Sequence, residues 1–374
     1  MFKYKFFWVS LYFYMILHLR SILVYDGSYY VGISILLQLI LMSIIVEFKT
    51  RKELMHGVDY LVKQLYLGLS ITFLIVTFIP NNLYGDFSLG GHYNLGGPKS
   101  DIIMPFIVTT VDSPLLSSII FIFSILIILN NKKLKGSWMR PKYKVFVIIL
   151  LILSLLELLL INRRGPIFAA LLTISTVVLF NKIRIVKLYY ILPIFVIAPL
   201  FWEVIASWLY KILSSDLGSS LITKTDPENI ETATGRVYTW NIVLDYMINF
   251  KWNIQYLFGV GQLPELEMLD DYGHAHNTIM ELLIQVGLVG TTIIYTLIIR
   301  SIRHFFYLVK INNNFSYHLL FSIILYFMFL SIGESLLSSG YFSHLLFISI
   351  LVIFNHIYYS NINKRPTIKN ILIV

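Results

Sequence analysis

The stretch YKVFVIILLILSLLELLLINRRGP, from Tyr143 to Pro166, decides the fold. It holds an apolar run long enough to cross about 30 Å of hydrocarbon as a helix, followed by a short polar connection to the next apolar run. Such runs recur along all 374 residues, of which 57% are hydrophobic, and the mean hydropathy is +0.76. This composition excludes an ordinary soluble globular protein, and we expect an all-α polytopic membrane protein.

The apolar runs predict about ten transmembrane helices, because backbone groups in lipid must satisfy one another. The runs lie at about 5–24, 28–46, 61–79, 102–130, 143–161, 166–181, 186–205, 277–299, 316–333 and 336–358. The first run is too long and too aromatic for a cleaved signal peptide. No repeat or linker indicates a second domain, so we expect residues 1–374 to form one transmembrane domain. The absence of cysteine excludes disulfides and thiolate chemistry.

The basic residues predict the orientation of these helices. If the amino terminus is cytoplasmic, 21 of the 29 Lys and Arg lie in inner segments, and every inner loop is basic. The positive-inside rule therefore predicts that both termini are cytoplasmic. The eight bases left outside are Arg20, Lys99, Arg163, Arg164, Lys211, Lys224, Arg236 and Lys251. The net charge of +9 is thus a topology signal, and we do not expect nucleic-acid binding.

Arg163 and Arg164 depart from this rule, because the topology places their connection, Asn162 to Gly165, outside the cell. Pro166 suits the first turn of a helix, and Gly165 permits close backbone approach. Two guanidinium groups just before free helix amides suit a phosphate or pyrophosphate. Anchoring in lipid headgroups is the alternative, and the choice between the two arginines stays open.

A large extracytoplasmic loop is expected at about 206–276, with short amphipathic helices in it. A helix is predicted from about Arg236 to Asn249. Its apolar positions recur at helical spacing and are Val237, Trp240, Val243, Leu244 and Met247. Arg236 in the first turn would oppose the helix dipole, so an anion bound there would explain it. A salt bridge to Glu231 or Asp226 is the alternative.

His274 and His276 precede the next apolar run. Two histidines at this spacing could ligate a metal, but no third ligand stands at motif spacing, so no metal is expected. A neutral imidazole near pH 7 suits a general base, and a simple interfacial histidine is the alternative. Asn277 and Glu281 follow on the eighth run, where polar groups generally face protein or a water cavity.

The outer helix ends thus present arginines and an imidazole, which suits a lipid-borne pyrophosphate donor. An acceptor hydroxyl would displace the pyrophosphate, the arginines would stabilise the departing charge, and the histidine would take the proton. The predicted catalytic residues are His276, Arg236 and Arg164. The predicted substrate-binding residues are Arg163, Arg164, Arg236, His274, Asn277 and Glu281. Gly287 and Gly290 are expected to permit close helix packing.

These motifs resemble a known family. The segment Asn162-Arg163-Arg164-Gly165-Pro166 resembles the S-R-G element of the bacterial O-antigen polymerase and O-antigen ligase superfamily, the Wzy-type proteins. Its GR…W…G.G…HN…G..G core is resembled by Thr234-Gly235-Arg236, Trp240, Phe258-Gly259-Val260-Gly261, His276-Asn277 and Gly287-Leu288-Val289-Gly290. The resemblance covers about 160–292, and the order, spacing and topology of the motifs carry it together.

The resemblance implies an inverting, metal-independent glycosyltransferase without a cofactor, in the bacterial plasma membrane. It would polymerise undecaprenyl-pyrophosphate-linked oligosaccharide repeat units into O-antigen, capsule or exopolysaccharide on the outer face. The implied partners are this donor, membrane lipid and a chain-length regulator protein. An O-antigen ligase that transfers glycan to lipid A core, in lipopolysaccharide synthesis, is the alternative with the same chemistry. A flippase or transporter is the other class, suggested by Glu157 and His18 within apolar runs.

Overall fold

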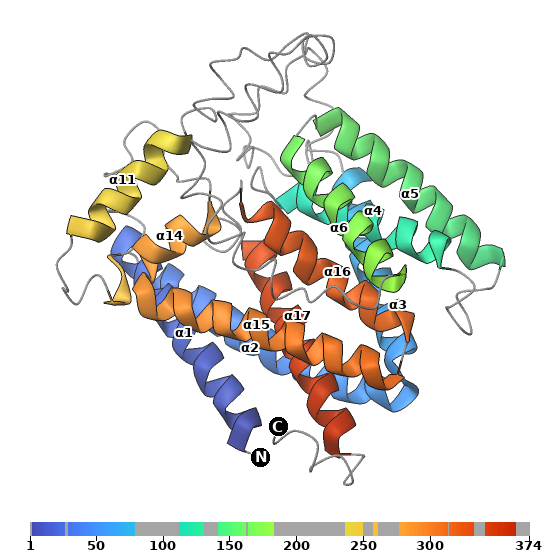
Figure 1. Ribbon diagram of the computed structural model, residues 1–374, viewed down its shortest axis with the longest axis horizontal. Coiled ribbons are helices and arrows are strands. Elements are labelled where there is room, and N and C mark those ends of the chain that lie inside the picture. The colour runs from blue at the N-terminus through green and yellow to red at the C-terminus, as the bar shows by residue number, and fades with distance from the viewer. Residues whose placement is uncertain are drawn as a thin grey trace.

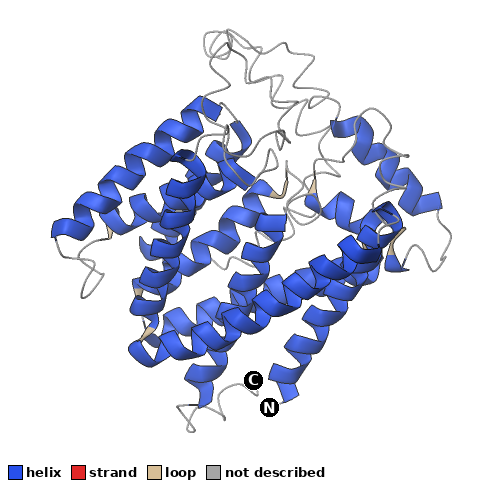
Figure 2. Cartoon of the chain, turned by 180° about the vertical axis from the view of Figure 1, so that it is seen from behind, coloured by secondary structure: helices blue, strands red, loops and turns tan. Residues whose placement is uncertain are grey.

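The structure is a computed structural model, and it describes ten ranges of the chain. These are residues 2–26, 29–78, 112–130, 141–161, 164–182, 236–249, 257–260, 277–312, 314–332 and 341–363. The regular secondary structure within these ranges is helical, with eleven bounded α-helices and one 3-10 helix. The expected all-α architecture is therefore confirmed for the described residues (Figure 2).

The helices follow the apolar runs closely. They are α1 (Phe2–Asp26), α2 (Tyr29–Glu53), η1 (Leu54–His56), α3 (Val58–Phe78), α4 (Asp112–Leu129), α5 (Pro141–Ile161), α6 (Arg164–Lys182), α11 (Arg236–Asn249), α14 (Thr278–Gln285), α15 (Gly287–Asn312), α16 (Phe315–Leu330) and α17 (Tyr341–Asn363). The expected run at 186–205 and most of the outer loop at 206–276 lie outside the described residues.

Several helices have the composition of membrane-spanning segments. Three stretches are long and apolar enough to cross a bilayer: Val58–Ile75, Gly287–Val309 and His344–Asn361. Four shorter apolar helices accompany them, at Lys5–Leu17, Pro114–Leu129, Gly165–Leu179 and Phe315–Leu330. The protein is therefore a membrane protein with apolar transmembrane helices.

Two expected boundaries were wrong. The run 277–299 is not one helix, because α14 ends at Gln285, Val286 forms a turn and α15 begins at Gly287. Gly287 has a φ of +69°, a left-handed conformation that interrupts the helical path and that glycine adopts without steric cost. The connection after α5 is also shorter than expected, because α6 begins at Arg164 and already contains Gly165.

The helices pack around α16, whose side chains from Phe315 to Met328 are all buried. This helix contacts α3, α4, α6, α15 and α17, while α4 contacts α5 and α6 (Figure 1). A helix that is apolar all round belongs in the interior of a bundle. The bundle interior is therefore protein on every side of α16, and lipid is left to the outer helices.

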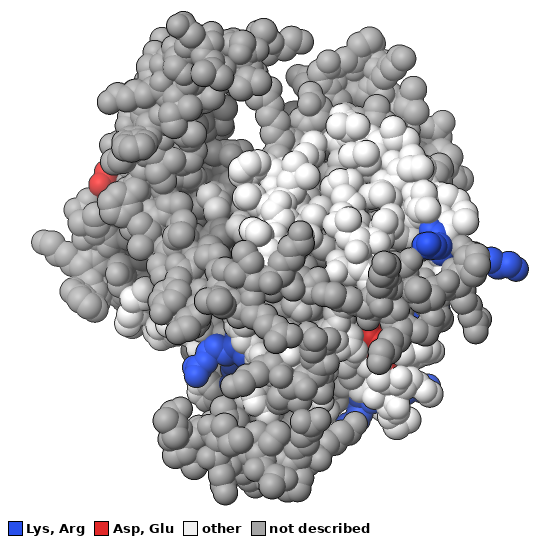
Figure 3. Space-filling model, turned by 45° about the vertical axis from the view of Figure 1, so that its right-hand side comes forward, with Lys and Arg blue, Asp and Glu red and all other residues white. Residues whose placement is uncertain are grey.

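The outer helices expose apolar side chains on one face. On α5 these side chains are Val145, Ile148, Ile149, Ile152, Leu155, Leu156 and Leu159. The opposite face of α5 buries Val147, Leu150 and Leu158. The described surface in Figure 3 is mainly uncharged, with Lys and Arg toward its margins. An apolar face of this kind suits contact with lipid chains rather than with water.

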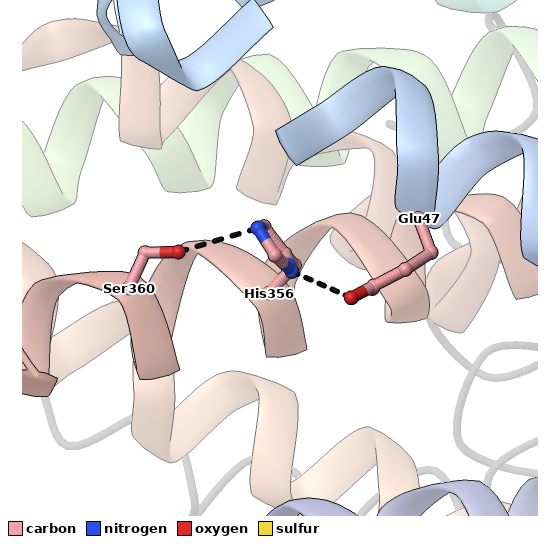
Figure 4. Close-up of polar contacts among 3 residues, drawn as sticks. All are labelled: Glu47, His356 and Ser360. Carbon is pink, nitrogen blue, oxygen red and sulfur yellow. Dashed lines mark hydrogen bonds and ion pairs between the residues drawn. The ribbon is translucent and has the colours of Figure 1, made fainter. Parts of the chain in front are cut away.

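Helices α2 and α17 are joined near their carboxyl ends by a side-chain clasp of Glu47, His356 and Ser360. Nδ1 of His356 lies 2.8 Å from Oε1 of Glu47, and its Nε2 lies 3.3 Å from Oγ of Ser360 (Figure 4). The imidazole is buried, and Ser360 follows it by one helical turn on the same face. The clasp connects residues 309 positions apart in the sequence.

Candidate active site

The amino end of α14 is capped by Asn277. This residue has the extended backbone of an N-cap, and its Oδ1 accepts hydrogen bonds from the amides of Ile279 (3.0 Å) and Met280 (3.1 Å). Its Nδ2 donates to the carbonyl of Ile332 (2.9 Å), just beyond α16. The cap thus joins the start of α14 to the end of α16.

The first four amides of α14 all have protein acceptors. The amide of Thr278 donates to the carbonyl of Ser331 at 3.0 Å, and the amide of Glu281 donates to the carbonyl of Asn277 at 3.1 Å. The amides of Ile279 and Met280 donate to Oδ1 of Asn277. The backbone at this helix end is therefore not a site for an anion, unlike an uncapped amino terminus. The Glu281 side chain is fully buried in the first turn, where a carboxylate interacts favourably with the helix dipole.

The other end of α14 meets residues 257–260 through backbone atoms. The amide of Val260 donates to the carbonyl of Ile284 at 2.8 Å. Gly259 has a φ of +79°, and a Cβ placed there would lie 2.2 Å from the carbonyl oxygen of Gln285. A Cβ on Gly287 would lie 2.4 Å from the nitrogen of Gly259. Glycine is therefore required at both positions, because any side chain would separate the two backbones.

The close packing expected at Gly287 and Gly290 is confirmed, and its partners are now defined. Gly287 contacts the 257–260 backbone, whereas a Cβ on Gly290 would meet the Val286 side chain at 2.6 Å and the Leu17 side chain at 3.3 Å. Leu17 belongs to α1, which packs along α15. The two glycines thus serve different contacts, one at the first residue of α15 and the other about one turn further along the same helix.

Helix α11 covers the same face of α14. Trp240 and Val243 are buried, and they form a small core with Met280 and Ile284. Val260 packs against this core as well. The expected helix from Arg236 to Asn249 is confirmed, its apolar face is confirmed at Trp240, Val243 and Leu244, and the partner of that face is α14.

The start of α6 lies at the same end of the bundle. Helix α6 packs against α16, and the last turn of α16 meets the first turn of α14. In Figure 1 the junction of α5 and α6 (both green), the start of α14 and the whole of α11 (yellow) lie at this end. The start of α1 and the end of α17 lie at the opposite end. We call the first the motif end, because the motif-bearing helices α6, α11 and α14 all begin there (Figure 1).

The predicted site residues can now be placed along the backbone. Arg164 is the first residue of α6 and Arg236 is the first residue of α11, so each stands at a helix amino end as expected. Arg163, His274 and His276 lie outside the described residues. His276 directly precedes the capping residue Asn277 in the sequence. The roles of all these residues in binding or catalysis stay predictions.

One residue at the motif end was missed by the sequence reasoning. The side chain of Arg20, on α1, donates from Nη1 to the carbonyls of Phe258 (2.9 Å) and Gly259 (3.0 Å). The sequence pattern marked Arg20 only as one of eight outer bases. On the expected topology, a base at this end of the first apolar run departs from the positive-inside rule, and this departure was the available signal.

These features define a class of protein: a membrane protein, helical throughout its described residues, in which two arginine-led helices and a tightly capped third helix all begin at one end of an apolar bundle (Figure 1). Residues 149–295 match the family described as O-antigen ligase, a stretch that runs from α5 through α6, α11 and α14 into α15. This match confirms the resemblance of the chain to the O-antigen polymerase and ligase superfamily that the sequence motifs indicated. No curated protein matches the chain.

Proposed function

We propose that the protein polymerises lipid-linked oligosaccharide repeat units into a long polysaccharide on the outer face of the bacterial plasma membrane. One observation carries the proposal: α6 and α11 both begin at an arginine and lie at the end of the bundle where α14 begins, within the matched residues 149–295. Helix amino ends with adjacent guanidinium groups are suited to a diphosphate. A family with a lipid-linked glycan substrate supplies such a donor.

In the proposed reaction an acceptor sugar hydroxyl attacks the anomeric carbon of the donor glycan. A new carbon–oxygen bond forms as the bond from that carbon to the pyrophosphate oxygen breaks, and the electron pair leaves with undecaprenyl pyrophosphate. His276 takes the hydroxyl proton as general base. Attack from the face opposite the leaving group inverts the configuration, and Arg164 and Arg236 stabilise the charge that develops on the pyrophosphate.

The remaining predicted residues have supporting roles in this proposal. Arg163 and His274 stand next to the proposed catalytic groups in the sequence and would contact the pyrophosphate or the glycan. Asn277 and Glu281 are buried, and the side-chain amide of Asn277 caps α14 and donates to the carbonyl of Ile332. Their contribution to substrate binding would therefore be to hold α14 and the residue that precedes it.

The expected topology is part of the proposal: about ten transmembrane helices with both termini in the cytoplasm and the motif end outside. It is supported by α1 starting and α17 ending at the same end of the bundle, opposite the motif end (Figure 1). Reaction on the outer face also suits a donor that is carried by a lipid rather than by a nucleotide.

The ligase alternative differs only in the acceptor, which would be lipid A core instead of another repeat unit. A deletion strain distinguishes the two activities. Loss of long glycan with single repeats still attached to the acceptor supports the polymerase. Complete absence of attached glycan supports the ligase and would replace the polymerase proposal.

The transporter alternative is less well supported by the described helices. A transporter would be expected to have broken helices in two related halves. The break at Val286–Gly287 is filled by the backbone of Gly259, so it forms a packed contact and not an open ion or substrate path.

The catalytic assignment is tested in membranes supplied with a lipid-linked repeat unit. Arg236→Ala, Arg164→Ala and His276→Ala are each expected to lower product formation by about 100-fold or more while leaving membrane insertion intact. Arg303→Ala is the matched control, because Arg303 is an exposed residue in the second half of α15. Wild-type rates from all three variants would refute the assignment.

A further inference from the structure

Arg20 connects two parts of the motif end that lie far apart in the sequence, α1 and residues 257–260. It stands near the end of α1, and a single nitrogen of its guanidinium reaches two consecutive carbonyls, those of Phe258 and Gly259. The partners are separated by 238 and 239 positions in the sequence. Arg20 is exposed, and its ionised donor makes each of these hydrogen bonds stronger than a neutral one at the same site.

The segment that Arg20 holds is also fixed by other contacts, because Phe258 packs against the main hydrophobic core. On its other side, Gly259 meets α14 through backbone atoms and Val260 donates to Ile284. Gly259 has no side chain to pack, and its backbone is held in a left-handed conformation. Glycine loses more conformational freedom on folding than any other residue, so this conformation depends on its contacts. Residues 257–260 therefore lie between α1 and α14. The side chains of Phe258 and Val260 and backbone contacts with α14 hold them, and Arg20 ties them to α1.

The position of this segment affects both neighbours of the proposed site. Val260 packs into the core that joins α11 to α14, and α11 begins with Arg236. Helix α14 follows His276 and its cap directly. A shift of residues 257–260 would therefore change the relation between the proposed pyrophosphate-binding arginine and the proposed base.

We propose that Arg20 is a positioning residue for glycan transfer, acting by holding residues 257–260 against α14. The proposal rests on the function proposed above. Arg20 acts through the backbone of the segment and contacts no substrate in this role. An outer arginine on the first helix runs against the positive-inside rule, and this tie explains why it stands there.

The first test measures the position of the segment without any assay of transfer. The chain has no cysteine, so Val260→Cys introduces a single thiol. Val260 is half-buried beside Trp240, and its labelling by a maleimide in detergent micelles should be slow. Adding Arg20→Met should raise the labelling rate roughly tenfold, because the two charge-assisted hydrogen bonds are lost.

Two further variants complete this test. Arg20→Lys should restore slow labelling in part, because an ammonium also donates to carbonyls. Arg51→Met, in which an exposed arginine of α2 is removed, should leave the labelling rate unchanged. Equal labelling with arginine or methionine at position 20 would overturn the proposal, whatever the enzyme does.

The second test follows transfer from a synthetic lipid-linked repeat unit. Arg20→Met should lower turnover at saturating donor by about tenfold or more, with a smaller change in the donor concentration for half-maximal rate. Arg20→Lys should recover part of the turnover. The thermal unfolding midpoint of each variant, measured in the same micelles, separates a positioning effect from a general loss of fold.

The outcomes distinguish this inference from the proposed function. Faster labelling with unchanged turnover would show that Arg20 holds the segment but does not position the reaction, and would overturn the proposal. A wild-type protein that forms no polymer and transfers no glycan would overturn the proposed function. The labelling test would then still decide whether Arg20 holds residues 257–260.

Discussion

At the motif end, contacts with backbone atoms fix both ends of α14 in addition to its side-chain core with α11, whereas at the opposite end the side chains of the clasp join α2 and α17. Gly259 and Gly287 leave no room for a Cβ, and Asn277 and Thr278 bond to backbone carbonyls. Glu47, His356 and Ser360 instead reach one another through flexible side chains. Where two backbones are in direct contact, an added side chain must push them apart. Where side chains make the contact, a substitution can be accommodated by other side-chain conformations.

The comparison suggests a division of roles. The motif end holds the proposed reaction, which requires catalytic groups to be kept in a narrow geometry. The clasp end needs only to keep two helices together. We therefore expect substitutions at the motif end to affect both stability and transfer, and substitutions in the clasp to affect stability alone.

The largest effect is expected for Gly259→Ala. The new Cβ would lie 2.2 Å from the Gln285 carbonyl oxygen, and the residue would keep a φ of +79° that alanine disfavours. We expect a loss of roughly 3–5 kcal/mol in the free energy of unfolding, or separation of residues 257–260 from α14. Thermal unfolding in micelles and the transfer assay measure the two effects.

Gly68→Ala is the matched control for this variant. Gly68 lies inside α3, and a Cβ added there would have no heavy atom of the described part of the chain within 4 Å. Alanine in a helix interior should be neutral or stabilise by up to about 1 kcal/mol. Comparable losses from both substitutions would remove the distinction between the packed and the open glycine.

A smaller loss is expected for Asn277→Ala. It removes the acceptor for two amides of α14 and the donor to Ile332, which together should cost about 2–3 kcal/mol. Asn314→Ala is the comparison, because Asn314 caps α16 through one amide, that of Ser316, and should cost about 1 kcal/mol. Transfer should fall with Asn277→Ala only. Equal effects on transfer would contradict a special role for the α14 cap.

His356→Ala tests the clasp end. It removes one hydrogen-bonding partner of Glu47 and should cost about 1–2 kcal/mol in the free energy of unfolding. Turnover per folded molecule should stay near wild type. His56→Ala, at an exposed histidine of η1, serves as the control for losing an imidazole. A drop in turnover as large as that of Asn277→Ala would break the proposed division between the two ends.

The smallest effect is expected for Ser360→Ala. Its hydroxyl lies 3.3 Å from Nε2 of His356, a long hydrogen bond at a half-buried site. The cost should be about 0.5 kcal/mol or less, measured by thermal unfolding beside His356→Ala. A loss equal to that of His356→Ala would indicate that the hydrogen bond to Ser360, and not the one to Glu47, accounts for the stability of the clasp.

Local patterns predicted the helices well where composition and spacing are strong. The start of α11 at Arg236 and its end at Asn249 followed from apolar spacing, and Pro166 lies in the first turn of α6 as proline chemistry requires. The break at Gly287 was missed, because apolar residues resume directly after Gln285 and flank Gly287 on both sides. A hydropathy pattern does not report a left-handed backbone.

Long-range contacts were beyond what the sequence pattern could supply. Glu47 and His356 lie 309 positions apart, and Arg20 and Phe258 lie 238 positions apart. Each pair depends on how whole helices pack, which single-residue chemistry does not determine. The motif residues Gly259, Asn277 and Gly287 were recognised, but their joint use in fixing the two ends of α14 became evident only in three dimensions.

Helix α14 is short and is fastened at both ends: by α16 through Asn277 and Thr278, and by residues 257–260 through Gly259 and Val260. At 1.5 Å per residue it spans only about 12 Å, too little to bend. Asn277, the residue directly after His276 in the sequence, is therefore held in place by its hydrogen bonds to both helices. If His276 is the base, most of the entropy needed to orient it is lost once, during folding, and not again in every catalytic cycle.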